Sequence, residues 1–380
     1  MQKNDSIQNK LISKRNQNTL RSYLKKFTKP GTFYLSLEDK TVQCYACAHQ
    51  CILKPGQVGI CQLRYNEDGK LMIPWGYVNT AQLDPIEKKP FNHFLPGALT
   101  LSFGMVGCNF HCSFCQNWLS AQALNDDLIH LSKQHISPTS PEELIRSAKN
   151  NHVKVIVSTY NEPLITSEWA VDIFRLAKEE GLYTAFVSNG YASPKGLKKL
   201  APYLDAIKID LKSFSEESYK LMGGHLQPVL STIAQAKELG LWVEVVTLTI
   251  PGFNDSLEEV WKTARSIAAI STDIPWHVTA FHPAYKMRDR QRTSAQILQT
   301  TAEIGEEAGL RYVYAGNLPG KVGSLEDTHC PNCQKPVIQR RGFTVTAYNI
   351  NKNGACKFCG CPIEGVWYKN PSDFKYPKWL

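Results

Sequence analysis

Three cysteines near the middle of the chain constrain it more than any other feature. Cys108, Cys112 and Cys115 stand at Cys-x3-Cys-x2-Cys spacing within the stretch LSFGMVGCNFHCSFCQNW, residues 101–118. An apolar run over residues 99–103 precedes them, and it is broken by Gly104 and Gly107. This pattern predicts a short buried strand that ends in a tightly bent loop. Such a loop can turn three thiolates toward one point.

Three thiolates are one fewer than the four that close an ordinary iron–sulfur cluster or a structural zinc site. A cluster held by three cysteines leaves one iron open to a substrate or a cofactor. The alternative is three buried cysteines that act as small hydrophobic side chains, or part of a zinc site. Cysteines in those roles seldom fall at this spacing, between glycines and at a strand end. The pattern therefore favours an iron–sulfur cluster.

The distribution of all 12 cysteines supports metal binding rather than disulfides. They fall into three groups, at residues 44–61, 108–115 and 330–361, in a chain of 380 residues. Short-spaced groups in a long chain without a signal peptide are typical of metal sites in a reducing cytosol.

The N-terminal group reads CYACAHQCILKPGQVGIC, with Cys44, Cys47, Cys51 and Cys61 as four possible ligands. Four thiolates in one short loop indicate a closed metal site, and both zinc and an auxiliary iron–sulfur cluster accept four thiolates. His49 could replace one ligand, although a lone histidine in such a loop is more often a surface or supporting residue.

The C-terminal group has two Cys-x2-Cys pairs, Cys330 with Cys333 and Cys356 with Cys359, and Cys361 follows closely. Two such pairs joined by a β-like segment predict a zinc ribbon. Cys361 is either spare or an alternative to Cys359. Many ribbons bind nucleic acid or protein, but a structural role is the simpler interpretation here.

The net charge of +9 gives little support for nucleic-acid binding. Residues 1–30 carry eight Lys or Arg against one Asp, a net +7, so the rest of the chain is nearly neutral. That polar, Asn/Gln-rich arm is expected to be solvated or partly helical. It lacks the apolar region of a secretory signal, and no later segment is apolar for long enough to span a bilayer. We expect a soluble cytoplasmic protein.

From residue 99 onward, apolar β-branched runs alternate with helical patterns. The predicted strands are 99–103, 153–158, 183–188, 206–211, 242–249 and 276–281. The predicted helices lie near 141–150, 164–180, 194–202, 228–239, 255–270 and 293–308, with start signals at Ser140 and at Asp255-Ser256. Such alternation predicts an α/β fold, a parallel sheet covered by helices and closed into a partial (β/α)6 barrel.

In such barrels, reacting groups gather at the carboxyl ends of the strands. The three-cysteine loop follows the first strand, and polar residues follow the other five. One polar residue at a strand end is usually a cap, but a series facing the cysteines indicates a site. The series includes Glu162, Ser188, Asn189, Asp210, Lys212, Thr249 and His282. For Asp210 and Lys212 the alternative is a mutual ion pair.

Two further segments are less informative. The connector, residues 68–98, begins with a hairpin-like piece and offers Asp84, Lys88, Lys89 and His93, which either face the site or only fix the connector to the next domain. Residues 311–320 (RYVYAGNLPG) are interpreted as structural, either closing the barrel edge or covering the substrate opening.

The three-cysteine spacing, with an aromatic residue just before the third cysteine, resembles the signature of the radical SAM enzymes. Within that superfamily the chain is similar to the pyruvate formate-lyase activating enzyme group, and most similar to its AmmeMemoRadiSam-system branch. The matching pieces are CYACAHQC, LDPIEKKP, GCNFHCSFCQNW, TYNEP, NGY, KIDLK, AFHP and the C-terminal ribbon.

This resemblance implies a [4Fe–4S] cluster on Cys108, Cys112 and Cys115, whose fourth iron chelates S-adenosylmethionine (SAM). One electron then cleaves SAM to a 5′-deoxyadenosyl radical, which abstracts hydrogen from an unknown substrate. Glu162 stands where the superfamily contacts the SAM amino group, although Tyr160 and Asn161 replace two glycines there. The positions that match the ribose and carboxylate contacts are Asn189, Asp210, Lys212 and His282.

The predicted organisation has four parts: a basic arm (1–38), a Cys-rich module with its connector (39–97), the radical SAM partial barrel (98–325) and a zinc-ribbon-like module (326–380). The expected cofactors are the [4Fe–4S] cluster, SAM and zinc. The expected partners are SAM, an electron donor such as flavodoxin or ferredoxin, and Memo-like and AMMECR-like proteins, with no membrane and no nucleic acid.

Two kinds of substrate remain open within the radical SAM class. The resemblance to activating enzymes favours a glycyl radical made on a partner protein, whereas the two extra cysteine modules favour a small molecule or another macromolecule. Outside the class, a non-enzymatic iron–sulfur or zinc protein would explain the cysteines but not the polar strand ends. Nucleic-acid modification would rest only on the basic arm and the ribbon.

Overall fold

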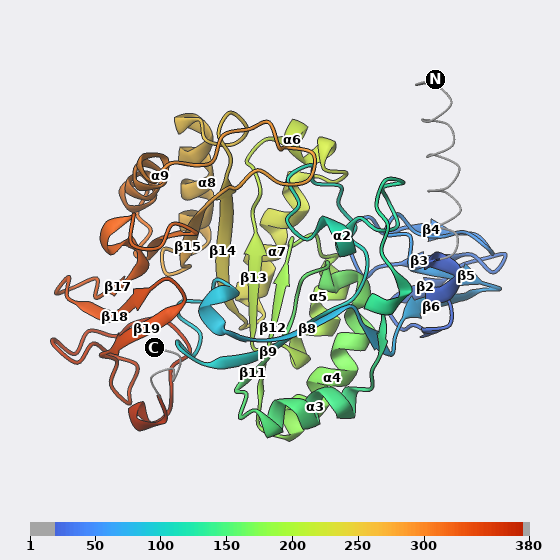
Figure 1. Ribbon diagram of the computed structural model, residues 1–380, viewed down its shortest axis with the longest axis horizontal. Coiled ribbons are helices and arrows are strands. Elements are labelled where there is room, and N and C mark those ends of the chain that lie inside the picture. Colours follow the sequence, from blue (N-terminus) through green and yellow to red (C-terminus); the bar gives the residue numbers. More distant parts are fainter. Residues whose placement is uncertain (1–19, 375–380) are drawn as a thin grey trace.

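The structure is a computed structural model that describes residues 20–374. Its centre is an eight-stranded sheet in the order β16-β15-β14-β13-β12-β11-β9-β8 (Figure 1). Seven strands are parallel: β9 (Leu99–Gly104), β11 (Val155–Ser158), β12 (Tyr183–Ser188), β13 (Ala206–Asp210), β14 (Trp242–Thr249), β15 (Trp276–Ala280) and β16 (Val313–Gly316). β8 (Thr80–Pro85) pairs antiparallel with β9 at one edge.

The parallel strands form because they are almost continuously apolar and lie under helices. Every residue of β11 and β15 is buried, as expected for strands covered on both faces. The covering helices are α3 (Pro141–Asn150), α4 (Ser167–Glu179), α5 (Pro194–Leu200), α7 (Leu226–Glu238), α8 (Leu257–Ile270) and α9 (Ala295–Glu307). Ser140 and Ser256 cap α3 and α8, and Ser140 forms a full capping box with Glu143.

The predicted strands and helices are confirmed within a few residues, but the sheet is larger than six strands. β8 was predicted only as connector, because Gln82 and Asp84 interrupt its apolar residues and leave no apolar run. β16 lies inside the segment interpreted as structural and extends the sheet by pairing parallel with β15. In the part of the chain that the structure describes, every helix is too short or too polar to cross a lipid bilayer.

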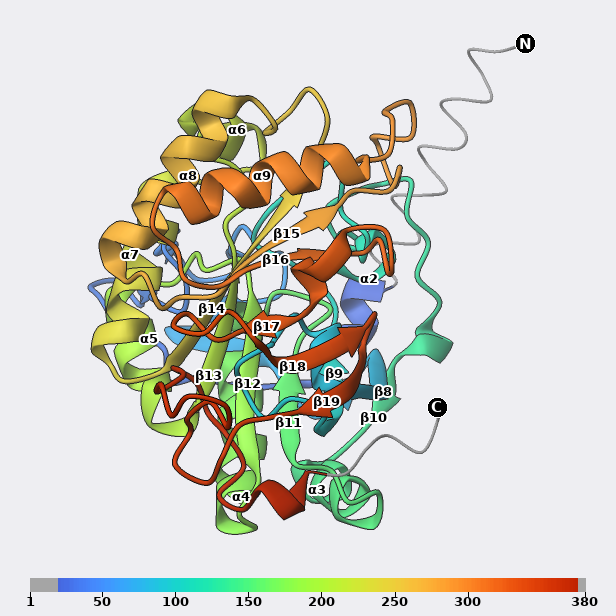
Figure 2. The same ribbon diagram turned by 90° about the vertical axis from the view of Figure 1, so that its left-hand side faces the viewer.

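Small sheets flank the large one at opposite ends (Figures 1 and 2). At one end lie β1 (Thr28–Pro30) with β6 (Lys70–Pro74) and β5 (Tyr65–Glu67), and β2 (Tyr34–Ser36) with β3 (Val42–Cys44) and β4 (Ile52–Leu53). At the other end lies the ribbon of β17 (Thr328–His329), β18 (Pro336–Arg341) and β19 (Thr344–Tyr348). β7 (Tyr77–Val78) and β10 (Ser137–Pro138) form a further pair.

The basic arm predicted for residues 1–38 differs from the structure in its second half, while residues 1–19 lie outside the described part. Residues 20–24 form a helical turn, and β1 and β2 follow it. Leu20, Leu24 and Phe33 are buried, so this segment packs on the body instead of forming a solvated arm. The basic residues dominate the sequence pattern of this segment, so these three apolar residues were not recognised as buried.

Buried carboxylates tie the flanking segments to the sheet. Glu168 on α4 receives the Arg64 guanidinium at 2.5 Å and also accepts the backbone N–H of Phe33 at 3.2 Å. Glu244 on β14 accepts the backbone N–H groups of Asn92 and His93, both at 2.9 Å. The connector that carries residues 86–93 is therefore fixed against the sheet.

Candidate active site

The three-cysteine loop begins where β9 ends, and its bend depends on glycine. Gly107 has φ of 98°, and a Cβ there would lie 2.5 Å from Leu63 Cδ1. A larger residue at position 107 would strain the backbone and clash. The loop then brings Cys108, Cys112 and Cys115 to the wall of one cavity of about 460 Å³.

The same cavity is lined by five of the seven residues predicted from the strand ends. They come from the loops and strands that follow β9 in the sheet, as the carboxyl-end rule requires. These residues are Glu162, Ser188, Asn189, Asp210 and Lys212. Thr249 is buried and does not line this cavity, and His282 lies in a neighbouring one, described below.

Glu162 is held by a set of donors from two strand ends. Its carboxylate accepts the Ser188 hydroxyl at 2.7 Å and the backbone N–H groups of Asn189 at 2.8 Å and Leu164 at 3.0 Å. Burial nevertheless raises the pKa of Glu162 to about 7. The adjacent Tyr160 has φ of 71°, a left-handed conformation that favours glycine and fits the glycine found there in the superfamily.

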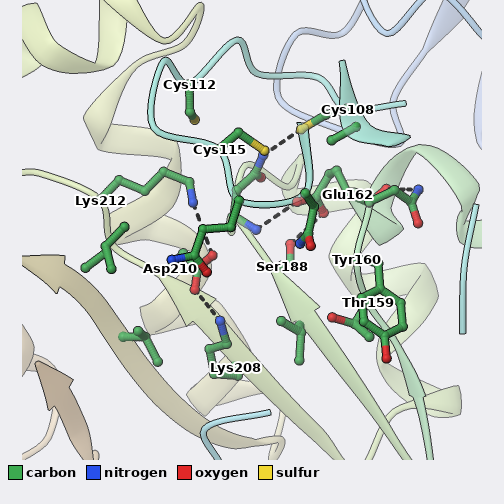
Figure 3. Close-up of a pocket in the computed structure, with 18 of the residues that line it drawn as sticks. Cys108, Cys112, Cys115, Thr159, Tyr160, Glu162, Ser188, Lys208, Asp210 and Lys212 are labelled. Carbon is green, nitrogen blue, oxygen red and sulfur yellow. Dashed lines mark hydrogen bonds and ion pairs between the residues drawn. The ribbon is translucent and has the colours of Figure 1, made fainter. Parts of the chain in front are cut away.

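Asp210 lies between two lysines (Figure 3). Lys212 Nζ lies 3.1 Å from Asp210 Oδ2, and Lys208 bonds the other oxygen. Burial alone would raise the pKa of Asp210, but the two cations outweigh it and lower that pKa to about 2. The ion pair considered for Asp210 and Lys212 is therefore present, and both groups still face the cavity.

Lys208 also lines the cavity but was not singled out from the sequence. It lies on β13 two residues before Asp210, and that period of two places both side chains on one face, so this signal was available. Of the connector residues, Lys89 lines the cavity and bonds Asp84 at 2.8 Å, whereas His93 lies apart, 2.5 Å from the Tyr314 hydroxyl.

The residues present fit the cluster that the loop predicts. The three thiols face one cavity, and burial raises the pKa of each, to about 12 for Cys115, so they ionise only when a cation binds them. Asn189 Nδ2 bonds Asn109 Oδ1 at 2.8 Å and approaches Cys108 Sγ at 4.0 Å, which fixes the start of the loop.

The C-terminal cysteines form a compact group. Cys330, Cys333, Cys356 and Cys359 have sulfur atoms that all lie within 4.8 Å of one another. A tetrahedral zinc ion places its sulfur ligands about 3.8 Å apart, and this group matches that spacing. The spare cysteine is therefore Cys361. Among residues 20–374, the N-terminal cysteines do not form a second group of that compactness.

The N-terminal cysteine loop instead packs directly on the three-cysteine loop. His49 Nε2 lies 3.0 Å from the carbonyl oxygen of Asn109, beside Cys108, and the Ala48 N–H donates to Tyr191 O at 2.9 Å. This places His49 at the contact between the two loops.

A second cavity of about 360 Å³ lies between the sheet and the ribbon, and Glu87 on its wall is almost completely buried. Burial raises the pKa of Glu87 from 4.5 to about 7. The folded state therefore keeps its proton to higher pH than the unfolded chain does. The stability contributed by this group is complete below about pH 4.5 and is lost as pH rises through 7.

The Glu87→Gln change is therefore expected to remove this loss of stability at high pH. Two to three pKa units correspond to roughly 3 kcal/mol, so the variant should be more stable than the wild type at pH 8 by up to that amount and nearly equal at pH 4.5. Thermal unfolding at the two pH values measures the difference. The exposed Glu67→Gln change is the control, and parallel pH curves for the wild type and Glu87→Gln would contradict the prediction.

Comparison with known proteins agrees with this site. Residues 103–267 match the Radical SAM superfamily. The uncharacterized protein MJ0808 of Methanocaldococcus jannaschii is 36% identical over 88% of this chain and 98% of its own length. The pyruvate formate-lyase-activating enzyme of Clostridium pasteurianum is 26% identical over 51% of this chain and 84% of its own length.

Among solved structures, a domain of the pyruvate-formate lyase-activating enzyme from Bacteroides vulgatus matches 42% of this chain and 98% of its own length, at 17% identity and a TM-score of 0.37. The fold and the site define an enzyme of the radical SAM type. The chain belongs to the radical SAM superfamily.

Proposed function

We propose that this protein cleaves SAM reductively at a [4Fe–4S] cluster and abstracts hydrogen from a substrate. The observation that supports it is one cavity lined by Cys108, Cys112 and Cys115 together with five polar residues from the ends of three successive strands. A cluster bound there supplies the electron that cleaves the sulfonium of SAM.

The residues of the cavity would bind the cluster and SAM. The three thiolates would hold the cluster, and Glu162 would accept a hydrogen bond from the SAM amino group. Lys212 would face the carboxylate of SAM, and Asp210 would accept hydrogen bonds from its ribose hydroxyls. Apolar side chains on the cavity wall, among them Phe110, Phe114 and the ribbon's Phe343, would limit the access of water to the reacting atoms.

We propose a metal site in each of the two flanking modules. The ribbon would hold zinc, and Cys44, Cys47, Cys51 and Cys61 would hold zinc or an auxiliary cluster. A flavodoxin or ferredoxin is the proposed electron donor. Memo-like and AMMECR-like proteins are proposed as further partners on the resemblance alone.

A second candidate function is the activation of a glycyl-radical enzyme. It is favoured by relatives named for that activity, including the putative glycyl-radical enzyme activating enzyme MJ1632 of Methanocaldococcus jannaschii, which is 29% identical over 46% of this chain. In that case the hydrogen would come from a glycine of a partner protein.

The proposed function predicts 5′-deoxyadenosine from protein that is reconstituted without oxygen, reduced with dithionite and mixed with SAM. Electron paramagnetic resonance should show a reduced cluster signal that changes when SAM is added. Protein with a full complement of iron and sulfide that yields neither result would refute the proposed function.

A further inference from the structure

The second cavity adjoins the candidate active site. The two cavities share five lining residues, so their contents lie next to each other: Pro90, Gln116, Thr279, Asn317 and Phe343. A molecule in the second cavity would therefore lie beside the chamber that we assign to SAM.

The walls of this second cavity come from distant parts of the chain. His277 and Tyr314 lie on β15 and β16, Glu87 lies in the short 3-10 turn Ile86–Lys88, and Arg340 lies on β18 of the ribbon. Figure 2 shows the ribbon beside β16. The Tyr314 hydroxyl bonds Thr328 Oγ1 of the ribbon at 2.8 Å, which holds the two walls together.

Arg340 is a buried cation on this wall. Its side chain is 2% exposed. Nη1 donates to Thr328 Oγ1 at 2.9 Å and to the Glu326 carbonyl at 3.3 Å, and Nη2 donates to the Asn92 carbonyl at 2.7 Å. All three acceptors are uncharged, and Nε has no hydrogen-bond partner among the described residues. A buried charge is costly unless an opposite charge meets it.

The carboxylate close to Arg340 neutralises it only in part. Glu87 Oε1 lies 3.7 Å from Arg340 Nε, beyond hydrogen-bond distance, and accepts the Gly97 N–H at 2.8 Å instead. With a pKa of about 7, this carboxyl group is about half protonated at neutral pH. By contrast, the buried Arg64 has Glu168 at 2.5 Å.

Three buried polar atoms of residues that line this cavity lack hydrogen-bond partners within residues 20–374. They are Arg340 Nε, Glu87 Oε2 and Nδ1 of His282. An unpaired buried polar atom calls for a partner, and a polar molecule in the cavity, like water, would supply one. His282, which the resemblance assigned to SAM, is placed with this group.

We propose that the second cavity binds the substrate, a small organic molecule with an anionic group, and that Arg340 recognises that group. This inference rests on the proposed function, because the cavity is a substrate site only if SAM is cleaved beside it. The cavity volume of about 360 Å³ lies at the small end of the roughly 300–1,000 Å³ typical of small-molecule sites. The ribbon walls one side of the cavity, which favours a small molecule over a glycine-bearing loop of a partner protein.

The test uses the full-length protein with its metals loaded and calorimetric titration. Malonate and inorganic phosphate are the anionic probes, and malonamide is the uncharged analogue of malonate. We expect at least one anion to bind and malonamide not to bind. Tighter binding of malonate than of phosphate indicates a carboxylate substrate, and the reverse indicates a phosphate. If neither anion binds, or if malonamide binds as tightly as malonate, the inference is overturned.

Variants locate the binding. Arg340→Gln should weaken the binding of the anion at least tenfold, and Arg340→Lys should weaken it less. The control is Arg341→Gln, since Arg341 is exposed on the same strand and does not line the cavity. Unchanged binding by Arg340→Gln would overturn the assignment.

If Arg340→Gln fails to fold, the Glu87→Gln variant tests the same inference. This change removes a negative charge beside Arg340 and should tighten anion binding several-fold at pH 8, whereas weaker or unchanged binding counts against the inference. Formation of 5′-deoxyadenosine by the wild type, measured separately, tests the proposed function. An anion site in a protein that does not cleave SAM would reject the function and leave the site standing.

Discussion

Cys112→Ala is expected to abolish the formation of 5′-deoxyadenosine, down to the background of protein without a cluster. Cys112 is 6% exposed and lines the candidate active site with two other cysteines. With only two thiolates left, the loop cannot hold a [4Fe–4S] cluster, so about four iron atoms per chain should be lost. Iron analysis and chromatography of the reaction products measure the two effects.

Cys361→Ala is the matched control for this change. Cys361 also carries a free thiol but lies outside the compact C-terminal group. The Cys361→Ala variant should retain both the iron and the activity. Circular dichroism should show that the Cys112→Ala chain remains folded, because the change removes a single sulfur atom from a loop. Wild-type product formation in Cys112→Ala would reject the assignment of the cluster to this loop.

The parallel sheet and its helices could be predicted from the sequence because their signals are local. Each parallel strand is a short apolar run, and serine caps mark the starts of α3 and α8. The edge strand β8 was missed because Gln82 and Asp84 interrupt its apolar residues. β16, Val313–Gly316, was not identified because it runs directly into a glycine- and proline-containing turn, which dominates the pattern of that segment.

The candidate active site could be predicted as far as the strand-end rule reaches. That rule places Glu162, Asn189 and Asp210 at one mouth whatever the details of packing, because parallel strands end at the same edge. It could not separate His282 from them, since the choice between two adjoining cavities depends on how the chain turns after β15.

The second cavity could not be predicted, because it is made by tertiary contacts alone. Glu87 is in the connector, Arg340 is in the ribbon, and neither stands in a pattern that implies the other. In the sequence, Arg340 stands beside a second arginine, Arg341, and nothing in that pattern distinguishes the two. In the structure Arg340 is buried and donates a hydrogen bond to the Asn92 carbonyl at 2.7 Å, unlike an exposed basic residue.

Removing the metal from the ribbon is expected to have the largest effect on stability. The Cys356→Ser change breaks a group in which Cys330 and Cys356 are almost completely buried. Structural zinc in small modules contributes about 10 kcal/mol or more to folding. The apolar side chains of residues 328–363 share one core with residues of the large sheet, and the rest of that sheet has a separate core. We therefore expect this segment to unfold locally without the metal, while the large sheet remains folded.

The loss would extend beyond the ribbon because the ribbon forms a wall of the second cavity. Arg340 and Phe343 would leave that wall, so anion binding should disappear together with the metal. Zinc analysis, hydrogen exchange over residues 328–363 and malonate titration measure the three effects. Cys361→Ser should change none of them. A Cys356→Ser chain that keeps both its zinc and its protection from exchange would show that these four cysteines do not hold a structural metal.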